Sequence, residues 1–140
     1  MRFLQTKKYS NIEIFPEQKT WVSSIERINE ALYKEGNYGF DIYVNECKIG
    51  FILLRKYGEN TFFLWDYIIH KNFQNRGYGT SSLIEFLNYL KKHFSTKRVV
   101  TTYIWGNEHA KYIYEKIGFT EIDVVDEEDI HEVNLEINLG

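Results

Sequence analysis

The sequence has one cysteine and one proline in 140 residues, and no long apolar run. Cys47 therefore has no partner for an internal disulfide bond, and a reducing compartment is its natural environment. No apolar stretch approaches the roughly 20 residues that span a bilayer. The first residues are also too polar for a secretory signal. We therefore expect a cytoplasmic protein without a membrane partner.

An excess of positive charge is also missing, since the formal net charge at pH 7 is −3. Proteins that bind nucleic acid through its phosphates carry a basic patch or stripe, so no nucleic-acid partner is expected. The histidines have no spacing typical of metal ligands, and no metal site is expected. Aromatic residues are frequent, at 17%, which favours a tightly filled interior or an aromatic-lined cleft and argues against disorder.

Apolar periodicity predicts one α/β unit, of the α+β type, over residues 1–140. Helical spacing predicts three helices, at about 17–34, 80–94 and 108–117. Alternating or β-branched residues predict six strands, at 40–44, 49–57, 61–70, 98–104, 119–125 and 131–139. The first three strands should form an antiparallel meander. No repeat and no domain boundary is evident, so we expect a single domain.

A glycine-rich turn at residues 74–79 joins a predicted strand to a predicted helix. The first N–H groups of a helix have no internal partners and the helix dipole favours negative charge there, so a pyrophosphate is a suitable ligand. Gly77 and Gly79 permit close approach of the backbone, and Arg76 and Thr80 add polar groups. The alternative is an ordinary strand-to-helix turn. No Lys-Ser/Thr follows, so a nucleotide-hydrolysing P-loop is not matched.

Two segments resemble the GCN5-related N-acetyltransferase (GNAT) superfamily. Residues 74–79, after Ile69, resemble its acetyl-CoA signature, Gln/Arg-x-x-Gly-x-Gly/Ala. Residues 107–119 resemble its later motif, in which a helix carries a tyrosine and ends in Gly-Phe. The resemblance covers about residues 17–140, and residues 66–69 look like the diamine (spermidine/spermine) acetyltransferase group. Family members usually carry a first strand and a longer first helix, so we expect an abbreviated N-terminal part here.

The resemblance implies acetyl-CoA as cosubstrate and a mixed, mostly antiparallel sheet flanked by helices. The strand ending at Ile69 would splay from the strand at 98–104, and the pantetheine arm would bond to main-chain groups at Ile68 and Ile69. Asn107 would contact the pantetheine, and Tyr114 would stand beside the sulfur. The implied cofactor-binding residues are Ile68, Ile69, Gln74, Asn75, Arg76, Gly77, Tyr78, Gly79, Thr80, Asn107 and Ala110.

The expected chemistry needs a proton acceptor and a proton donor. An alkyl amine has a pKa near 10.4, so it must lose a proton before it attacks a thioester. The departing thiolate benefits from a donor, and a tyrosine is suitable. We assign these catalytic roles to Asp66 and Tyr114. The alternatives are a solvated Asp66 on an edge-like strand, a core Tyr114, and His70 as the base or as mere polar surface.

The expected function is transfer of an acetyl group from acetyl-CoA to a primary amine of a small molecule, with a polyamine-like acceptor favoured. Cys47 is far in sequence from both motifs, so we expect direct attack in a ternary complex. The alternatives are a protein or peptide N-acetyltransferase and a non-catalytic CoA-binding regulatory module. The acidic turn at 126–129 either attracts a polyamine or is a solvated loop, and Trp21 is either core or acceptor pocket. A homodimer through an exposed strand edge is also considered.

Overall fold

The computed structural model describes residues 1–10 and 12–140, and within them seven strands form one mixed sheet in the order β1-β2-β3-β4-β5-β7-β6. The strands are β1 (Arg2–Thr6), β2 (Asn37–Val44), β3 (Cys47–Gly58), β4 (Thr61–Ile69), β5 (Arg98–Ile104), β6 (Thr120–Glu127) and β7 (Ile130–Asn138). The α-helices are α1 (Ile25–Leu32), α2 (Tyr78–Phe94) and α3 (Glu108–Ile117), and the 3-10 helices are η1 (Pro16–Thr20) and η2 (Lys71–Phe73). The predicted α+β class is confirmed.

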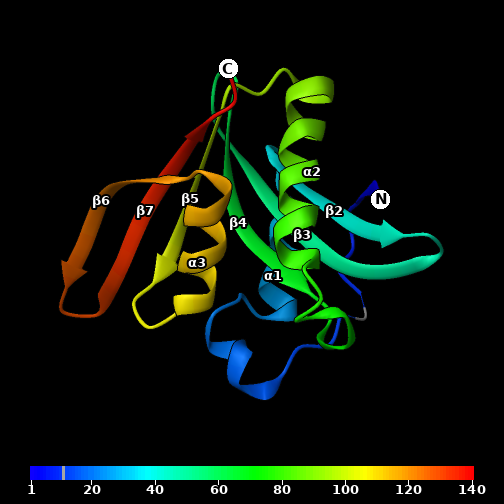
Figure 1. The fold of residues 1–140 in the computed structure, drawn as a ribbon, viewed down its shortest axis with the longest axis horizontal. Helices are drawn as coiled ribbons and strands as arrows, with labels where there is room; N and C mark the ends of the chain where they lie inside the picture. The colour runs from blue at the N-terminus through cyan, green and yellow to red at the C-terminus, as the bar shows by residue number, and fades with distance from the viewer. Residues whose placement is uncertain (11) are drawn as a thin grey trace.

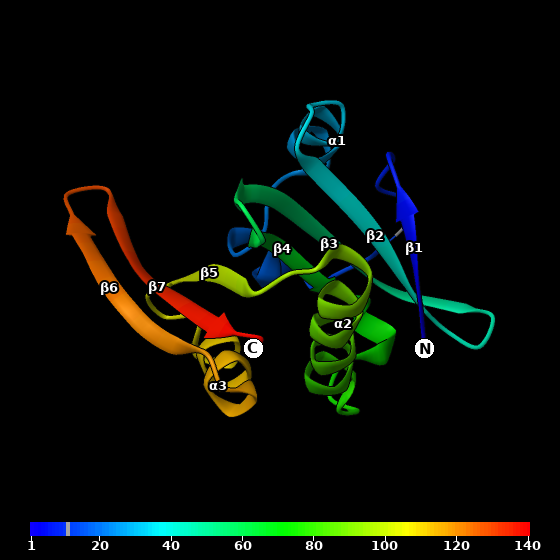
Figure 2. The ribbon, with the colours of Figure 1, turned by 90° about the horizontal axis from the view of Figure 1, so that it is seen from above.

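Strands β2 to β4 form the predicted antiparallel meander, and β1 adds to its edge, also antiparallel. Among the described residues only the β4–β5 pairing is parallel. Strands β5, β7 and β6 continue the sheet in antiparallel fashion. Helices α2 and α3 cover one face of the sheet and α1 lies on the other, as the view from above shows (Figures 1 and 2). The sheet therefore separates two layers of side chains.

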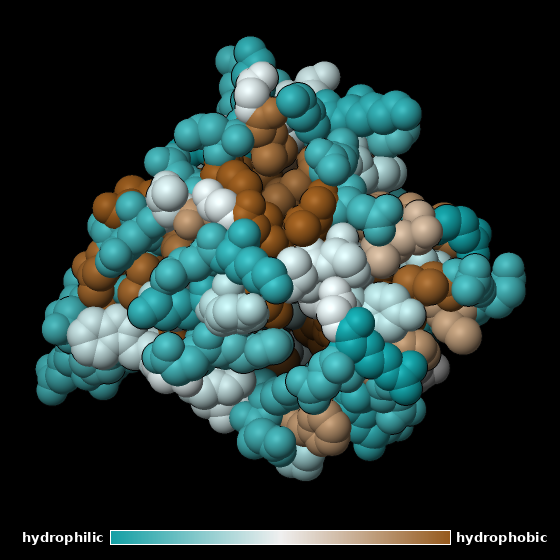
Figure 3. Space-filling model, in the orientation of Figure 1, coloured by the Kyte–Doolittle hydropathy of each residue, from teal (hydrophilic) through white to brown (hydrophobic). Residues whose placement is uncertain are grey.

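The larger buried layer lies between the sheet and helices α2 and α3. The predicted apolar face of α2, with Leu83, Leu87 and Leu90, is buried in it, together with Phe86. Apolar side chains of this side reach the surface between α2 and β7, where polar residues surround them (Figure 3). The smaller layer packs α1 against the opposite face of the sheet. Burial of these two layers is the main force that holds the domain together.

The single helix predicted at 17–34 is wrong. Helix η1 ends at Thr20, residues 21–24 form a linker, and α1 begins at Ile25. Ser24 caps α1, because its side chain accepts a hydrogen bond from Arg27 N at 3.2 Å. Serine competes for backbone hydrogen bonds in this way and favours a helix start over a helix interior. Trp21 consequently lies in the linker and lines a cleft, rather than the core.

Strand β1 has no counterpart among the predicted strands. It is an edge strand of five residues that pairs only with β2. Burial does not alternate along it, so the period-2 pattern by which the other strands were predicted is missing. The N-terminal part is thus shortened in its helix, to the eight residues of α1, but it retains a first strand. Among the described residues no helix has the length and hydropathy needed to cross a membrane.

Candidate active site

A cleft opens where β4 and β5 diverge. The two strands pair only from Thr61–Leu64 against Arg98–Thr101. The last pair is held by Thr101 Oγ1, which donates a hydrogen bond to Leu64 O at 3.0 Å. Beyond this pair lies a cleft of about 710 Å³, lined by β4, β5, α3, the start of α2 and the η1–α1 segment. The predicted splay of the central strands is confirmed.

A β-bulge in β4 determines on which face of the sheet the side chains of β4 lie. Leu64 and Asp66 each pair with a residue of β3, whereas Trp65 between them has no partner in the register. A bulge reverses the alternation of side chains along a strand. Leu64 accordingly packs in the layer of α2, whereas Ile68 packs in the layer of α1. Asp66 is thereby turned toward the linker that precedes α1.

Asp66 is buried, with 5% of its surface exposed. Its Oδ1 accepts a hydrogen bond from Ser23 N at 3.0 Å, and its Oδ2 has no partner among the described residues. Burial raises the pKa of the Asp66 carboxyl, and the hydrogen bonds from Ser23 and the charge of Arg27 only partly oppose this. The predicted alternative of a solvated residue on an edge-like strand is therefore wrong, since β4 is central in the sheet. Such a carboxylate can accept a proton.

Tyr114 lies on the buried face of α3, with 8% of its surface exposed, and its ring packs 5.4 Å from that of Phe119. Burial raises the pKa of Tyr114 to about 12, the negative charge of Asp66 adds to the shift, and hydrogen bonding with Thr101 opposes it. The phenol is therefore protonated at neutral pH and can donate a proton. Asp66 and Tyr114 both line the cleft. One cleft thus contains a group that can accept a proton, Asp66, and a group that can donate one, Tyr114.

The glycine-rich turn leads directly into α2 at one end of the cleft. Gly77 has φ of 84°, a left-handed conformation that glycine adopts without strain, and a Cβ there would meet no atom within 4 Å. The cleft is lined here by Asn75, Gly77, Gly79 and Thr80. The open space and the free N–H groups of the first turn of α2 fit an anionic group.

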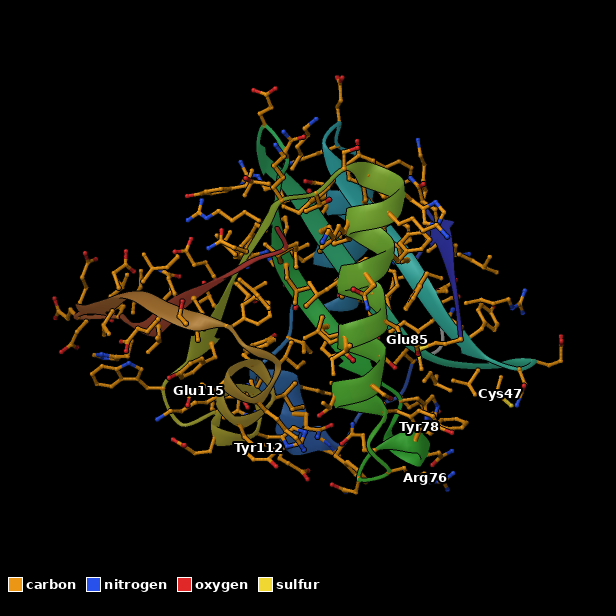
Figure 4. The ribbon with its side chains drawn as sticks, turned by 45° about the horizontal axis from the view of Figure 1, so that its top comes forward. Cys47, Arg76, Tyr78, Glu85, Tyr112 and Glu115 are labelled. Carbon is orange, nitrogen blue, oxygen red and sulfur yellow. The ribbon has the colours of Figure 1, made fainter. Side chains whose placement is uncertain are left out.

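Two of the residues predicted to bind the cofactor direct their side chains away from the cleft. Arg76 is exposed and its guanidinium lies 5.7 Å from the centre of the Phe73 ring. Tyr78 packs near the same ring, with 6.1 Å between centroids. Both lie on the side of α2 away from α3, and neither is among the residues that line the cleft (Figure 4). Only their backbone groups remain available to a ligand of the turn.

Two further hydrogen bonds fasten the turn to β4. Tyr67 donates its hydroxyl hydrogen to Gly79 O, with 2.6 Å between the oxygens. Gln74 Nε2 donates to Ile69 O at 2.9 Å. Burial also raises the pKa of Tyr67, so this phenol stays a donor. The role of Tyr67 was missed in the sequence, because nothing local to residues 66–69 indicates contact with the helix that follows.

The remaining predicted residues fall into two groups. Ile68, Ile69, Asn107 and Ala110 line the cleft. Asn107 is the N-cap of α3 as predicted, since its Oδ1 accepts a hydrogen bond from Ala110 N at 3.3 Å. His70 instead caps η2, with its Nδ1 accepting from Asn72 N at 3.1 Å, and it does not line the cleft. Cys47 is exposed on a distant hairpin (Figure 4).

Sequence patterns missed most of the cleft wall on the α1 side. Arg27, Trp65 and Glu132 line it, and the Arg27 guanidinium lies 5.9 Å from the centre of the Trp65 ring. These residues come from α1, β4 and β7, and no spacing in the sequence connects them. In the described part of the chain no three His, Cys, Asp or Glu side chains come together as a metal site.

Comparison with known structures agrees with this geometry. A GNAT family acetyltransferase from Elizabethkingia anophelis, solved with acetyl-CoA bound, has a TM-score of 0.71 at 19% identity, and the match covers 98% of each chain. A spermidine N-acetyltransferase from Vibrio cholerae, solved in complex with CoA and spermine, has a TM-score of 0.66 at 16% identity. That match covers 81% of this chain and 72% of the other. At these identities the likeness concerns the fold.

A comparison with curated protein sequences finds no match. The family profile for the acetyltransferase (GNAT) domain, however, matches residues 2–120, which is most of the chain. The match includes the divergent strands, the glycine-rich turn and the helix that carries Tyr114. The chain therefore belongs to the GNAT family and is an acetyl-CoA-dependent N-acetyltransferase.

Proposed function

We propose that the protein transfers the acetyl group of acetyl-CoA to a primary amine of a small molecule, by direct attack in a ternary complex, and that a polyamine-like amine is the first candidate acceptor. The observation that carries this proposal is the position of Asp66 and Tyr114 in one cleft that begins where β4 leaves β5. A carboxylate and a phenol in this arrangement supply the two proton transfers that amide formation requires.

The proposed cofactor site follows β4 and the turn after it. Pairing with β5 stops at Leu64, so Ile68 and Ile69 have no strand partner on that side of β4. Backbone groups without a partner favour a ligand that completes the ladder, which supports a pantetheine arm there. Gln74, Asn75, Gly77, Gly79 and Thr80 would hold the diphosphate, together with the backbone of Arg76 and Tyr78. Asn107 and Ala110 would contact the pantetheine from α3.

The proposed chemistry balances within the cleft. The neutral amine nitrogen attacks the thioester carbonyl carbon, a C–N bond forms, and the C–S bond breaks. The proton of the amine passes to Asp66, directly or through water, and the Tyr114 phenol gives its proton to the departing sulfur. The ammonium form of the acceptor has by then released one proton to solvent, which costs about 4.6 kcal/mol at pH 7 for an ordinary alkyl amine. The proton that Asp66 accepts is the second one, which the nitrogen must lose once the C–N bond has formed.

Two observations bear on the acceptor. The carboxylates of Asp66 and Glu132 line the cleft, which supports a cationic acceptor, as does the fold shared with the V. cholerae spermidine N-acetyltransferase. Arg27, above the Trp65 ring on the same wall, favours a second candidate, an amine that also carries a carboxylate, such as an amino acid or a peptide. The two candidates differ in the sign of the charge that Arg27 would meet.

The test is a thiol-release assay with acetyl-CoA across polyamines, amino acids, aminoglycosides and peptides. We expect release with a polyamine, and Arg27→Ala should leave or improve kcat/KM for it. A fall of kcat/KM with Arg27→Ala on an amino acid would support the second candidate. Binding of acetyl-CoA without thiol release from any amine would contradict the proposal and favour a regulatory CoA-binding module. Stable capture of peptides would favour a protein acceptor.

The proposal also includes a cytoplasmic location and a homodimer. The sheet ends in two edge strands, β1 and β6, and an exposed edge can pair with a second chain. Light scattering coupled to size-exclusion chromatography measures the mass, and a monomer at micromolar concentration would remove the dimer from the proposal.

A further inference from the structure

The wall of the cleft on the α1 side is a segment with few apolar anchors. We name residues 13–23 the acceptor wall; six of them line the cleft, namely Ile14, Gln18, Thr20, Trp21, Val22 and Ser23. Helix η1, inside this segment, has no buried residue. Ile14 and Val22, on either side of η1, pack against the smaller hydrophobic layer. Hydrophobic packing therefore contributes little to the position of η1 itself, where polar contacts are the relevant ones.

Both ends of the acceptor wall are hydrogen-bonded to the chain segment from β4 to η2 that precedes the glycine-rich turn. Lys71 N donates to Glu13 O at 2.8 Å, and Lys71 Nζ lies 3.1 Å from Glu13 Oε2. At the other end, Ser23 N donates to Asp66 Oδ1 at 3.0 Å. The exposed ion pair contributes little, so the hydrogen bonds are the relevant contacts. The wall thus spans from η2 to the bulge of β4.

Between these ends, Gln18 and Gln74 form a reciprocal pair of amide hydrogen bonds. Gln18 Nε2 donates to Gln74 Oε1 at 2.8 Å, and Gln74 Nε2 donates to Gln18 Oε1 at 2.9 Å. The second hydrogen of Gln74 Nε2 is used by Ile69 O at 2.9 Å. Gln74 therefore connects the wall to the end of β4 and to the first residue of the glycine-rich turn. Both glutamines are half-buried.

We propose that Gln18 is a positioning residue that couples the acetyl-CoA site to the acceptor wall through Gln74, an inference that rests on the proposed function. A ligand that orders the turn also orders Gln74, and Gln74 then holds Gln18 and the wall beside Asp66. Acetyl-CoA or CoA thus tightens amine binding. By thermodynamic linkage the amine tightens CoA binding by the same factor.

The experiment measures this coupling with spermidine as the amine probe. Its dissociation constant is determined by calorimetry with and without CoA, which forms a complex that cannot react, and steady-state kinetics follow with acetyl-CoA. Gln18→Met keeps the volume but removes the hydrogen bonds to Gln74 and the bond that Phe15 N donates to Gln18 Oε1 at 3.2 Å. Gln18→Glu keeps acceptor oxygens for both Gln74 Nε2 and Phe15 N. Gln5→Met, on exposed β1, is the matched control.

We expect CoA to tighten spermidine binding in the wild-type protein and in Gln5→Met. Gln18→Met should lose this effect, with KM for the amine about 3- to 10-fold higher, as for loss of one or two hydrogen bonds. Its kcat and its CoA affinity without amine should stay within about 2-fold of wild type, because Ser23 N still bonds to Asp66 Oδ1 and Gln74 Nε2 still donates to Ile69 O. For Gln18→Glu, both the coupling and KM for the amine should lie between those of the wild type and Gln18→Met.

Equal coupling in wild type, Gln18→Met and Gln18→Glu overturns the inference while thiol release continues to support the proposed function. A parallel loss of kcat, both affinities and the far-UV circular dichroism signal in both variants also overturns it, because it indicates a general structural role. If the wild-type protein releases no thiol with spermidine or any other amine of the panel, the proposed function fails, and the coupling fails with it.

Discussion

At the scale of single residues, the protonation states of Asp66 and Tyr114 depend on each other. The charge of Asp66 raises the pKa of Tyr114, and it also raises the pKa of Tyr9, which burial brings to about 12. Burial, with a smaller contribution from the charge of Asp66, therefore keeps the neighbouring phenols protonated. At neutral pH this places a proton acceptor and a proton donor in one cavity.

Asp66→Asn should increase stability and decrease activity at pH 8. Burial raises the folded-state pKa of Asp66 above its unfolded value. Both states are protonated at low pH, and the penalty for the buried charge develops as pH rises through the folded-state pKa. Asparagine avoids this penalty and keeps an acceptor for Ser23 N. We expect a gain of about 1 kcal/mol in urea unfolding at pH 8, a smaller gain at pH 4, and kcat/KM about 100-fold lower.

The control for this prediction is Asp41→Asn. Asp41 forms an ion pair with Lys48 at 3.2 Å and does not line the cleft. Burial raises the pKa of Asp41 as well, and Lys48 only partly opposes this, so the substitution should also increase stability at pH 8 while leaving kcat/KM unchanged. An Asp66→Asn variant with wild-type activity, or with the same stability difference at both pH values, would contradict the assignment.

Tyr114→Phe should lower kcat by about 100-fold or more, as expected for loss of a general acid. The dissociation constant of acetyl-CoA should change by less than about 2-fold, because the ring remains. In the wild-type enzyme the pKa of about 12 predicts that this phenol causes no alkaline fall of kcat below about pH 10. Stopped-flow measurement of the chemical step is decisive, with the exposed Tyr57→Phe as control. An unchanged rate of that step would remove Tyr114 from the mechanism.

At the scale of elements, β4 organises the site. Its bulge turns Asp66 toward one face of the sheet, and the end of its pairing with β5 at Leu64 leaves Ile68 and Ile69 open to the cleft. The strand itself was predicted from its apolar and aromatic residues. The bulge was not, because burial alternates along all of β4 and only the register with β3 reveals the unpaired Trp65.

Tyr67→Phe tests the connection between β4 and α2. The variant loses the hydrogen bond to Gly79 O, and the start of α2 is then less well fixed relative to the strand. We expect KM for acetyl-CoA to rise about 3- to 10-fold and the free energy of unfolding to fall by about 1 kcal/mol. The rate constant kcat should be nearly unchanged in steady-state assays. Tyr38→Phe, in the same packed layer, is the control, and a fall of kcat at constant KM would instead assign Tyr67 to the chemistry.

At the scale of the whole molecule, helices α2 and α3 pack on different parts of the same face of the sheet. Helix α3 packs its buried face on the β5–β7 part of the sheet and α2 packs on the β2–β4 part, as the views along two axes show (Figures 1 and 2). The cleft lies between these halves. A ligand that contacts both halves binds only the folded state, and it should therefore stabilise the whole domain.

Acetyl-CoA should accordingly raise the unfolding temperature. At a concentration of 100 times its dissociation constant the stabilisation is about 2.7 kcal/mol, which corresponds to about 10 °C for a domain of this size. Differential scanning fluorimetry measures the shift. Gly77→Ala should reduce the shift, because φ of 84° is unfavourable for alanine. Gly58 has open space around it and no left-handed backbone, so Gly58→Ala should show the wild-type shift. Equal shifts in both variants would argue against the turn as the ligand site.

Local patterns in the sequence determined the elements that hold the site. Periodicity predicted α2, α3 and the meander, the glycines predicted the turn before α2, and Asn107 predicted the start of α3. These features are visible in the sequence because helix caps, left-handed turns and amphipathic faces depend on residues within a few positions of one another.

Only the tertiary structure decided the orientation of Asp66, the linker at 21–24 and the Gln18–Gln74 pair. The two glutamines are 56 positions apart, and Ser23 and Asp66 are 43 apart. The helix predicted through residue 21 is interrupted where Ser23 N bonds to a carboxylate of the central sheet. Such contacts form only when packing brings distant segments together, because a buried polar group takes whichever partner the fold places within reach.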